Sequence, residues 1–437
     1  MKTSPRQSLI AALWLAAPAA LAAQLPISST RALGMANGYA ASARGYEAIA
    51  WNPALLGMSD RPGFSLNLFQ VSGELGDNSF NLSDFQKYKD KVLSKADKDT
   101  ILSEVLDGTT SRPLSIRVGA GLTSLAMTFG GFGISLSGGG SADASLSSDF
   151  VELALFGNVT RSGNGQKYLG TGTAANALGS GTLAVAYGSR LPTPVGQLAV
   201  GATVKFTNGV AVGRAEDAGT SLQSSPTFQS VVGGQALFTD VSKNVSNGSG
   251  VGVDVGGVYE LASGLRFGVS IENLVNVMSW KDANLKYSRK VFALTQNGDQ
   301  FSDSTIADDS LVTYNPNNPV QRAMHDSLFA HGTFPTRIRG SVSMRSGMLT
   351  LVGGAEFRVR SGIVSSDAQV VSAGAELLPL GILALRAGVS SNFEGGTTLA
   401  GGAGLKLGPL RWDVGLTSTS SGDRKGFQAA AGFSLMN

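Results

Sequence analysis

The sequence contains no cysteine and only two histidines among its 437 residues. Without cysteine there is no disulfide framework and no thiol chemistry, so packing and backbone pairing must stabilise the fold. His325 and His331 are too few for an ordinary zinc site. His325, Asp326 and Ser327 are consecutive, but a catalytic triad needs side chains that converge in space. We therefore expect no enzyme activity, no metal and no cofactor.

Charge is scarce as well. Charged residues make up 15% of the chain, and the formal net charge is only +3. No run of Lys or Arg resembles a nucleic-acid-binding patch, so nucleic acid is not an expected partner. After the N-terminal region, no apolar run is long enough for a membrane helix.

The N-terminus has a short apolar run from Leu9 to Ala23, preceded by two basic residues. This arrangement, with the small residues Ala20 and Ala22 at its end, is typical of a secretory signal peptide. We expect cleavage after Ala22, so that residues 1–22 are removed and the mature protein is exported.

From about residue 63 to the end, apolar and polar residues alternate in short segments. Leu, Phe, Val and Ile alternate with Arg, Gly, Ser and Glu in residues 265–272, and residues 410–417 repeat the pattern. A period of two indicates strands with one apolar and one polar face. The polar face is rich in Gly, Ser and Arg, which suits a crowded lumen, while the apolar face suits lipid. The predicted fold class is all-β, an antiparallel transmembrane β-barrel in the outer membrane.

The alternating segments number about fourteen, with an uncertainty of two because residues 214–248 can contain further strands. Short connections with Gly or Pro indicate periplasmic turns, and the longer gaps indicate outside loops. The barrel would occupy residues 63–437, preceded by an N-terminal segment at 23–62. The predicted strands are 63–73, 114–129, 131–145, 179–191, 196–213, 249–261, 264–277, 335–346, 348–360, 369–379, 382–392, 396–407, 409–420 and 425–436.

Helical periodicity is evident only in the first long gap, at residues 82–107. Ser83 can cap a short turn, and Ser94 with Asp97 can cap a longer helix. This predicts a helical outside loop that either forms an apolar collecting groove or packs on neighbouring loops. The residues it would bury are Ile101, Leu102, Val105 and Leu106.

The stretch "YEAIAWNPALLGM", residues 46–58, places an Asn-Pro pair ahead of the first strand. Asn52 is a favourable N-cap and Pro53 a favourable first helical residue, so a short helical turn should end near Gly57. The turn is either an ordinary capped connection or an element that sits inside the lumen.

Two motifs carry a family resemblance. "RALGMANGYAASARGYEAIAWNPALLGM", residues 31–58, resembles the N-terminal signature of the FadL-type long-chain fatty-acid transporters and the related PorV-like barrels. "FPTRIRGSVSMR", residues 334–345, is similar to a late strand of those barrels. The insertion at 80–108 is more similar to a group of uncharacterised FadL-like outer-membrane proteins. The resemblance implies fourteen strands and an N-terminal hatch that includes Asn52, Pro53 and Ala54.

The third predicted strand, "FGISLSGGGSADASL", contains Gly138, Gly139 and Gly140 in succession. Three glycines weaken a strand and allow it to bend or bulge. The resemblance implies that the wall opens toward the bilayer in this strand. The alternative is that the glycines provide curvature or make room for the hatch.

Charged residues share the predicted inner face of the barrel. They form either a ladder of ion pairs that fills the lumen and anchors the hatch, or an Arg-lined path for a carboxylate or phosphate head group. The members of the ladder are Arg266, Glu272, Arg337, Arg339, Glu356, Arg358, Arg386, Arg411 and Asp413.

These observations predict an outer-membrane barrel for passive uptake of a hydrophobic or amphipathic small molecule, such as a lipid or fatty-acid-like compound. The alternative is a PorV-like barrel that receives or anchors exported proteins at the cell surface. The expected partners are outer-membrane lipid, the cargo and the barrel-assembly machinery, and a monomer is favoured.

Overall fold

The computed structural model describes residues 29–77, 92–106, 114–157, 167–223, 228–297, 300–330, 332–364, 369–393, 396–419 and 425–437. The predicted signal peptide at 1–22, the turn at Ser83 and His331 lie outside these residues. All nineteen described strands belong to one antiparallel sheet.

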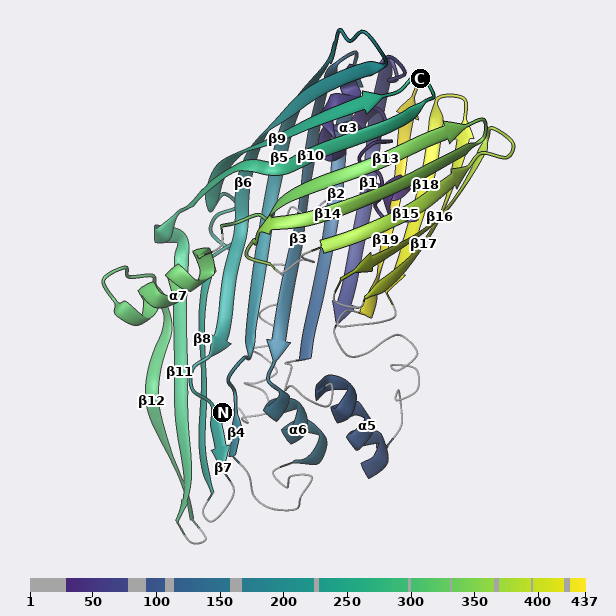
Figure 1. Cartoon of the computed structure of the whole chain (residues 1–437). Coiled ribbons are helices and arrows are strands. Elements are labelled where there is room, and N and C mark those ends of the chain that lie inside the picture. The colour runs from purple at the N-terminus through teal and green to yellow at the C-terminus, as the bar shows by residue number, and fades with distance from the viewer. Residues whose placement is uncertain are drawn as a thin grey trace.

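Fourteen of the strands close a barrel, because the last one, β19, pairs with the first, β1 (Figure 1). The predicted fold class and strand number are therefore confirmed, and strands such as β2 begin and end where the alternation predicts. In barrel order the strands are β1 (Phe64–Asp77), β2 (Leu114–Phe129), β3 (Phe132–Leu146), β5 (Ala174–Leu191), β6 (Gln197–Asp217), β9 (Gly248–Glu260), β10 (Leu265–Trp280), β13 (Thr336–Ser346), β14 (Leu349–Arg360), β15 (Gln369–Leu377), β16 (Leu383–Asn392), β17 (Thr397–Leu407), β18 (Leu410–Thr419) and β19 (Lys425–Met436).

Short and long connections alternate between the two ends of the barrel. At the end where the C-terminus lies, tight turns carry glycines with positive φ, including Gly130 at 56° and Gly264 at 81° (Figure 1). Glycine is required there because side chains disfavour this backbone conformation. We call this the short-turn end and the opposite one the long-loop end.

The two faces of the wall differ as the alternation predicts. Val269 and Val414 are 51% and 43% exposed on the outside, whereas Ser270 and Asp413 are 3% and 7% exposed on the inside. Apolar side chains in adjacent strands thus form a continuous outer surface. A surface of this extent is suited to lipid.

The outer surface leads to a first prediction. Replacing Val269 or Val414 by Arg should lower the free energy of unfolding in lipid vesicles by about 2–4 kcal/mol if the residue lies near the bilayer midplane. Urea titration monitored by heat-modifiable migration on gels measures the change. Val245→Arg is the control, since Val245 is 74% exposed but lies between strands at the long-loop end. Equal losses in all three variants would contradict the assignment of the lipid face.

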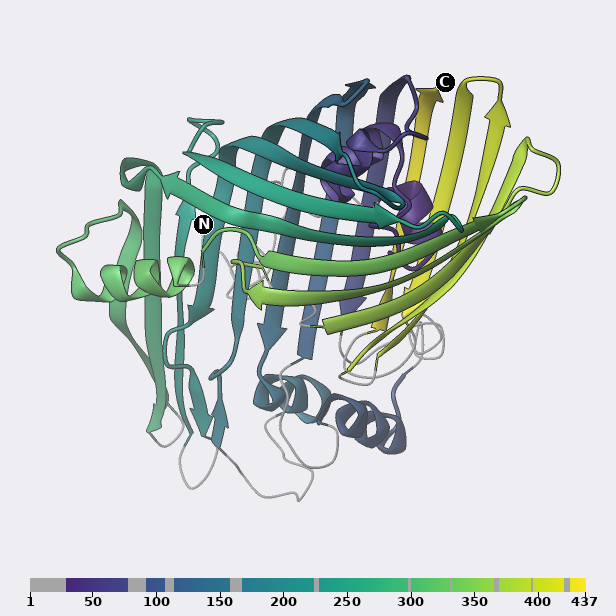
Figure 2. The same cartoon turned by 45° about the horizontal axis from the view of Figure 1, so that its top comes forward.

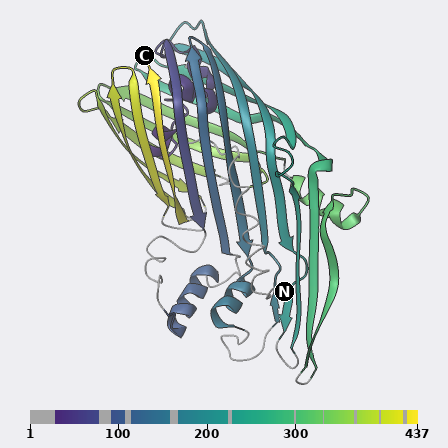
Figure 3. The same cartoon turned by 180° about the vertical axis from the view of Figure 1, so that it is seen from behind.

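A second, smaller group of strands projects from the barrel at the long-loop end (Figures 1 and 3). It arises because β6 continues beyond its last partner on β9, and its free edge at Gly213–Asp217 then pairs with β8. The predicted outside loops at 214–248 and 278–334 therefore contain strands, but none that enters the barrel. The group comprises β4 (Lys167–Leu169), β7 (Ser221–Gln223), β8 (Gln229–Thr239), β11 (Leu285–Asn297) and β12 (Gln300–Thr313), with η3 (Asp282–Asn284) and helix α7 (Pro319–Phe329).

The predicted loop helix is present as α5 (Lys95–Leu106) and packs against α6 (Ser148–Phe156) at the long-loop end (Figure 2). Ser94 and Asp97 cap it reciprocally: the Ser94 amide donates to the Asp97 carboxylate at 2.9 Å, and the Asp97 amide donates to the Ser94 hydroxyl at 3.2 Å. Leu102 is fully buried against Val151 of α6, so the helix packs on a neighbouring loop as one interpretation predicts. Within the described ranges, no helix has the length and hydropathy to cross a membrane.

Candidate functional site

The N-terminal segment forms a helical hatch inside the barrel (Figure 2). Leu33, Tyr39, Ala48 and Met58 are completely buried, although the helices of this segment are very short. Short helices are unstable alone, so the surrounding wall must hold them in place. The hatch, which we define as residues 29–62, consists of α2 (Thr30–Gly34), η1 (Gly45–Glu47), α3 (Ala48–Trp51) and η2 (Pro53–Gly57), with its connections.

The Asn-Pro corner is both a cap and an attachment to the wall. The Asn52 side-chain oxygen accepts a hydrogen bond from the Ala54 amide at 3.1 Å, which caps η2 as the sequence predicts. Its side-chain nitrogen donates to the carbonyls of Gly257 and Val269, both at 3.3 Å. Both interpretations of the corner are therefore correct: it is a capped turn, and it lies in the lumen.

The wall has glycines where the Asn-Pro corner approaches it. A Cβ atom at Gly188 or Gly201 would overlap the backbone of Pro53, and one at Gly256 would overlap the Asn52 side chain. These glycines lie on β5, β6 and β9, so three neighbouring strands together form a depression that accommodates the corner. Glycine allows this close approach because it has no side chain.

Asn52→Ala leads to a second prediction. It removes a cap, worth about 1 kcal/mol, and two hydrogen bonds to the wall, each worth about 1 kcal/mol. We expect the barrel to fold normally and to conduct ions more often in planar bilayers, because the hatch is held less tightly. Asn318→Ala is a matched control, since Asn318 caps α7 outside the lumen. Unchanged conductance in Asn52→Ala, with an intact barrel, would argue against attachment through this corner.

Buried ion pairs hold the opposite side of the hatch. Arg31 of α2 contacts the carboxylate of Glu376 on β15 at 2.9 Å and that of Glu47 in the hatch at 3.4 Å. On the wall, Arg386 contacts both Glu376 and Asp413 at 2.7 Å. All five side chains are at most 10% exposed. This arrangement favours ion pairs that anchor the hatch.

A second cluster of ion pairs lies above Trp51 of the hatch. Arg339 contacts Glu272 at 2.6 Å and Glu356 at 2.7 Å, and its guanidinium lies 5.0 Å from the centre of the Trp51 ring. Arg337 contacts the same two carboxylates at 3.5 and 3.2 Å. A guanidinium over an indole ring adds cation–π attraction to the hatch contact.

Arg266 and Arg358, two further members of the predicted ladder, lie outside these two clusters. Arg266 contacts Glu260 at 2.9 Å and Asp60 of the hatch at 2.7 Å. Arg358 lies opposite Arg337 in the pairing of β13 with β14. The predicted charges therefore form separate clusters around the hatch, and most of them pair with one another or with hatch residues.

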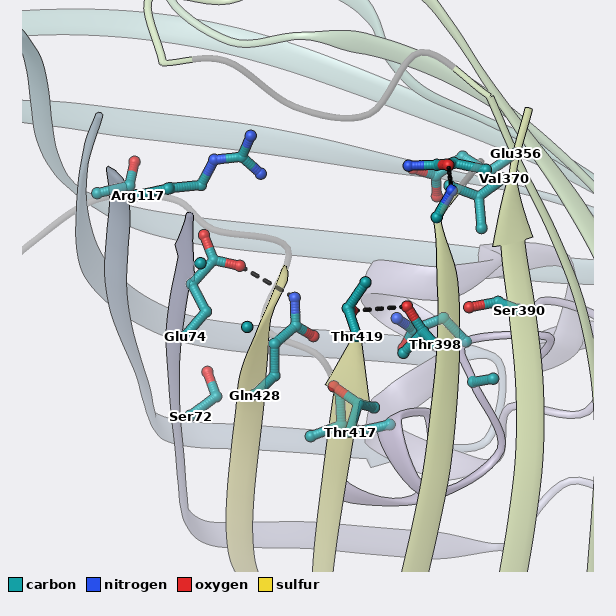
Figure 4. Close-up of a pocket in the computed structure, with 18 of the residues that line it drawn as sticks. Ser72, Glu74, Arg117, Glu356, Val370, Ser390, Thr398, Thr417, Thr419 and Gln428 are labelled. Carbon is teal, nitrogen blue, oxygen red and sulfur yellow. Dashed lines mark hydrogen bonds between the residues drawn. The ribbon is translucent and has the colours of Figure 1, made fainter. Parts of the chain in front are cut away.

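An outer chamber of about 340 Å³ lies between the hatch and the long-loop end. Figure 4 shows part of its lining, where hydroxyl and amide groups lie beside the charged Glu74 and Arg117: Gln428 donates to Glu74 at 3.0 Å, and the hydroxyls of Thr398 and Thr419 lie 2.7 Å apart. Part of its rim is apolar, because Leu178, Phe334 and Val364 belong to an apolar cluster between the barrel, α7 and the projecting strands. The chamber thus has many polar groups in its lining and an apolar edge.

An inner chamber of about 510 Å³ lies on the other side of the hatch, toward the short-turn end. Its lining includes Arg31 and Arg44 of the hatch, and Gly264 and Gly347 of two tight turns. Of the described residues, none lines both chambers. The hatch therefore separates them.

The three glycines of the third strand lie in a continuous part of the wall. Gly138, Gly139 and Gly140 pair with β2 on one side and with β5 on the other. An opening there requires these ladders to break, so a lateral exit at this strand stays a prediction.

Sequence reasoning missed an irregularity in the neighbouring strands. The pairing register shifts at Leu68 of β1 and at Ser124 of β2. The buried Asn67 side chain donates to the Thr123 carbonyl at 3.0 Å, and the Ser124 hydroxyl donates to the Leu136 carbonyl at 3.2 Å. The consecutive apolar pair Leu68-Phe69 interrupts the period of two and is the signal that predicts such a bulge.

His325 is in a packing environment. Its ring stacks on Tyr314 with centres 5.0 Å apart and lies 3.6 Å from Asp282. His325 also lies 3.4 Å from the carboxylate of the next residue, Asp326. Over the described ranges, no three His, Cys, Asp or Glu side chains are arranged to hold a metal ion.

The chain belongs to a protein family of unknown function, DUF5723, whose model matches residues 53–315. Three solved structures are similar to it. A TodX mutant lacking S2 and S3, described as a monoaromatic hydrocarbon channel, has a TM-score of 0.51 and 12% identity over 93% of this chain and 98% of its own. A Pseudomonas aeruginosa FadL homologue has a TM-score of 0.44 and 11% identity over 95% and 99%. The Ralstonia pickettii toluene transporter TbuX has a TM-score of 0.44 and 14% identity over 93% and 98%.

The similarity to the structure with a TM-score of 0.51 confirms the predicted FadL-type resemblance at the level of the fold, and the fold is that of an outer-membrane β-barrel. No curated protein matches the chain. The PorV-like resemblance stays a prediction.

Proposed function

We propose that the protein is an outer-membrane channel for passive uptake of a small amphipathic molecule, with the hatch as its closure. The long-loop end would face the exterior and the short-turn end the periplasm. The outer chamber is the observation that carries this proposal. Its hydroxyl and amide lining suits a polar head group, and its apolar rim at Leu178, Phe334 and Val364 suits a hydrocarbon part.

The mixture of polar and apolar groups in the lining favours an amphipathic cargo over a purely hydrophobic one. Pockets for apolar ligands are lined predominantly by apolar and aromatic side chains. The similar channel with a TM-score of 0.51 is described as one for monoaromatic hydrocarbons. A hydrocarbon in the outer chamber of this chain would instead face Ser72, Thr417 and Gln428 (Figure 4).

Uptake by a deletion strain tests the proposal. We expect the deletion to slow the entry of a labelled monoacylglycerol across the outer membrane and to leave the entry of toluene unchanged. Wild-type protein supplied from a plasmid should restore entry, whereas Leu178→Ser with Phe334→Ser at the rim should not. Equal monoacylglycerol entry with and without the gene would contradict the proposal.

The exit route leads to a third prediction. If cargo leaves sideways through the third strand, Gly139→Val should abolish transfer of the monoacylglycerol while leaving its binding intact, because a branched side chain favours regular pairing. Transfer and binding are measured separately on assembled barrels. Normal transfer in a folded Gly139→Val protein excludes this route, and cargo must then pass the hatch.

One observation favours the PorV-like alternative. The projecting strands β8, β11 and β12 carry an extended sheet beyond the barrel, which a transport path does not require (Figure 3). A receiver of exported proteins would use such a surface. Comparing the surface proteome of the deletion strain with that of wild type distinguishes the two functions: a loss of surface proteins with normal uptake supports the alternative.

A further inference from the structure

The inner chamber has more positive charge than its carboxylates neutralise. Seven basic and four acidic residues line it. Each carboxylate already contacts a guanidinium at 2.6–2.9 Å. The excess of three positive charges therefore falls on Arg345, Lys406 and Arg411, which form no ion pair with any described residue.

Two of these three cations directly face each other in the wall. Lys406 of β17 and Arg411 of β18 are cross-strand partners, and like charges in that position are destabilising. The Arg411 Nε atom is buried without a hydrogen-bond partner. A buried donor with no acceptor costs free energy, so this pair is suited to receive an acceptor from outside the chain.

Positive charges also outnumber carboxylates around Arg44, on the hatch side of the chamber. The pKa of Arg44 is below its ordinary value because of burial and because of the positive charges of Arg31, Arg345 and Arg266, although Asp60 raises it. Arg44 is already paired with Asp60 at 2.6 Å. Arg44 therefore has three cations near it in addition to the one carboxylate with which it pairs.

We propose that the inner chamber is a binding site for an anionic group, a phosphate or a carboxylate, held by Arg411, Lys406 and Arg345. The planar fork of a guanidinium matches the oxygens of both groups. The chamber volume of about 510 Å³ admits a small molecule. The side chain of Met35 in the same lining would contact a short alkyl part. This site lies across the hatch from the outer chamber and does not depend on the proposed uptake.

Calorimetric titration of the full-length protein in zwitterionic nanodiscs tests the site. The probes are inorganic phosphate, octyl phosphate and octanoate, added at low ionic strength. We expect Arg345→Gln with Arg411→Gln to weaken binding about tenfold or more, because two charge-assisted hydrogen-bond donors are lost. Arg322→Gln removes the same charge from the exposed face of α7 and should leave binding unchanged. Salt should weaken wild-type binding.

The probes also distinguish the source of the anion. Binding of inorganic phosphate indicates a free anion, and binding only when phosphatidic acid is included in the nanodisc indicates a lipid head group. Because neither arginine forms an ion pair with a described residue, the double variant should fold, which heat-modifiable migration checks. Arg345→Gln alone, at an exposed side chain, gives a second and milder variant. Equal affinity in wild type, Arg345→Gln and Arg322→Gln, or no binding of either the soluble probes or phosphatidic acid, would overturn the proposal.

Discussion

Replacing Gly201 by Val should displace the hatch and raise the ionic conductance of the barrel by about an order of magnitude or more. A side chain at this position would overlap the backbone of Pro53 and Ala54, and neither the wall nor a proline corner can easily move away. Overpacking of this kind typically costs about 1–3 kcal/mol, and each 1.4 kcal/mol lost from the closed state increases the open fraction about tenfold.

Planar-bilayer recording of the purified variant measures this effect. Gly401→Val is the matched control, because a Cβ atom at Gly401 of β17 meets no other atom within 4 Å. The same change of residue on a similar strand should leave conductance at the wild-type value. A Gly201→Val barrel that assembles correctly and stays closed would show that the hatch is held without the glycine depression.

The barrel strands were predictable because each position faces either lipid or the lumen. Where both environments are uniform along a strand, apolar and polar residues alternate, as in residues 410–417, and the strand ends become visible in the sequence. The projecting strands do not have these two environments. β12, "QFSDSTIADDSLVT", is exposed along most of its length, so its residues alternate poorly and it was predicted as part of a loop.

In the hatch, local sequence predicts the cap but not the contacts with distant strands. The cap at Asn52 follows from a rule about adjacent residues and was predicted. The glycines that receive it lie about 135 to 205 residues further along the chain, and nothing local separates Gly201 from the other 57 glycines of the sequence. Their role depends on which strands become neighbours.

For the charge clusters, the sequence predicts the residues on the barrel wall but not their partners in the hatch. The alternation places Glu376, Arg386 and Asp413 on the inner face, but their hatch partners Arg31 and Glu47 lie in a segment with no strand period. Residues 29–58 contain three charges, Arg31, Arg44 and Glu47, and so few charges in a mainly apolar stretch are a usable signal, since charges are rarely buried unless paired.

Arg31→Met should undock the hatch more strongly than any other single change to its ion pairs. Arg31 is the only described cation in contact with Glu47, whose residue is 3% exposed. Without it, Glu47 keeps only hydroxyl donors from Tyr39 and Ser29. Removing one partner of a buried ion pair typically costs about 3–5 kcal/mol, because the remaining charge is uncompensated. We expect raised conductance and protease cleavage within residues 29–62, with the barrel intact.

A second substitution separates the loss of charge pairing from the loss of packing. In Arg31→Met with Glu47→Gln, the uncompensated carboxylate is gone, and the amide can still hydrogen-bond with Tyr39 and Ser29. The double variant should therefore recover much of the closed state, and the departure from additivity gives the coupling energy of the pair. If the double variant leaks as much as Arg31→Met alone, the contact of Arg31 with Glu376 at 2.9 Å, rather than the pairing with Glu47, holds the hatch. If neither variant leaks or becomes sensitive to protease, the ion pairs fill the lumen without anchoring the hatch, and the Asn52 corner with its glycine depression is the principal attachment.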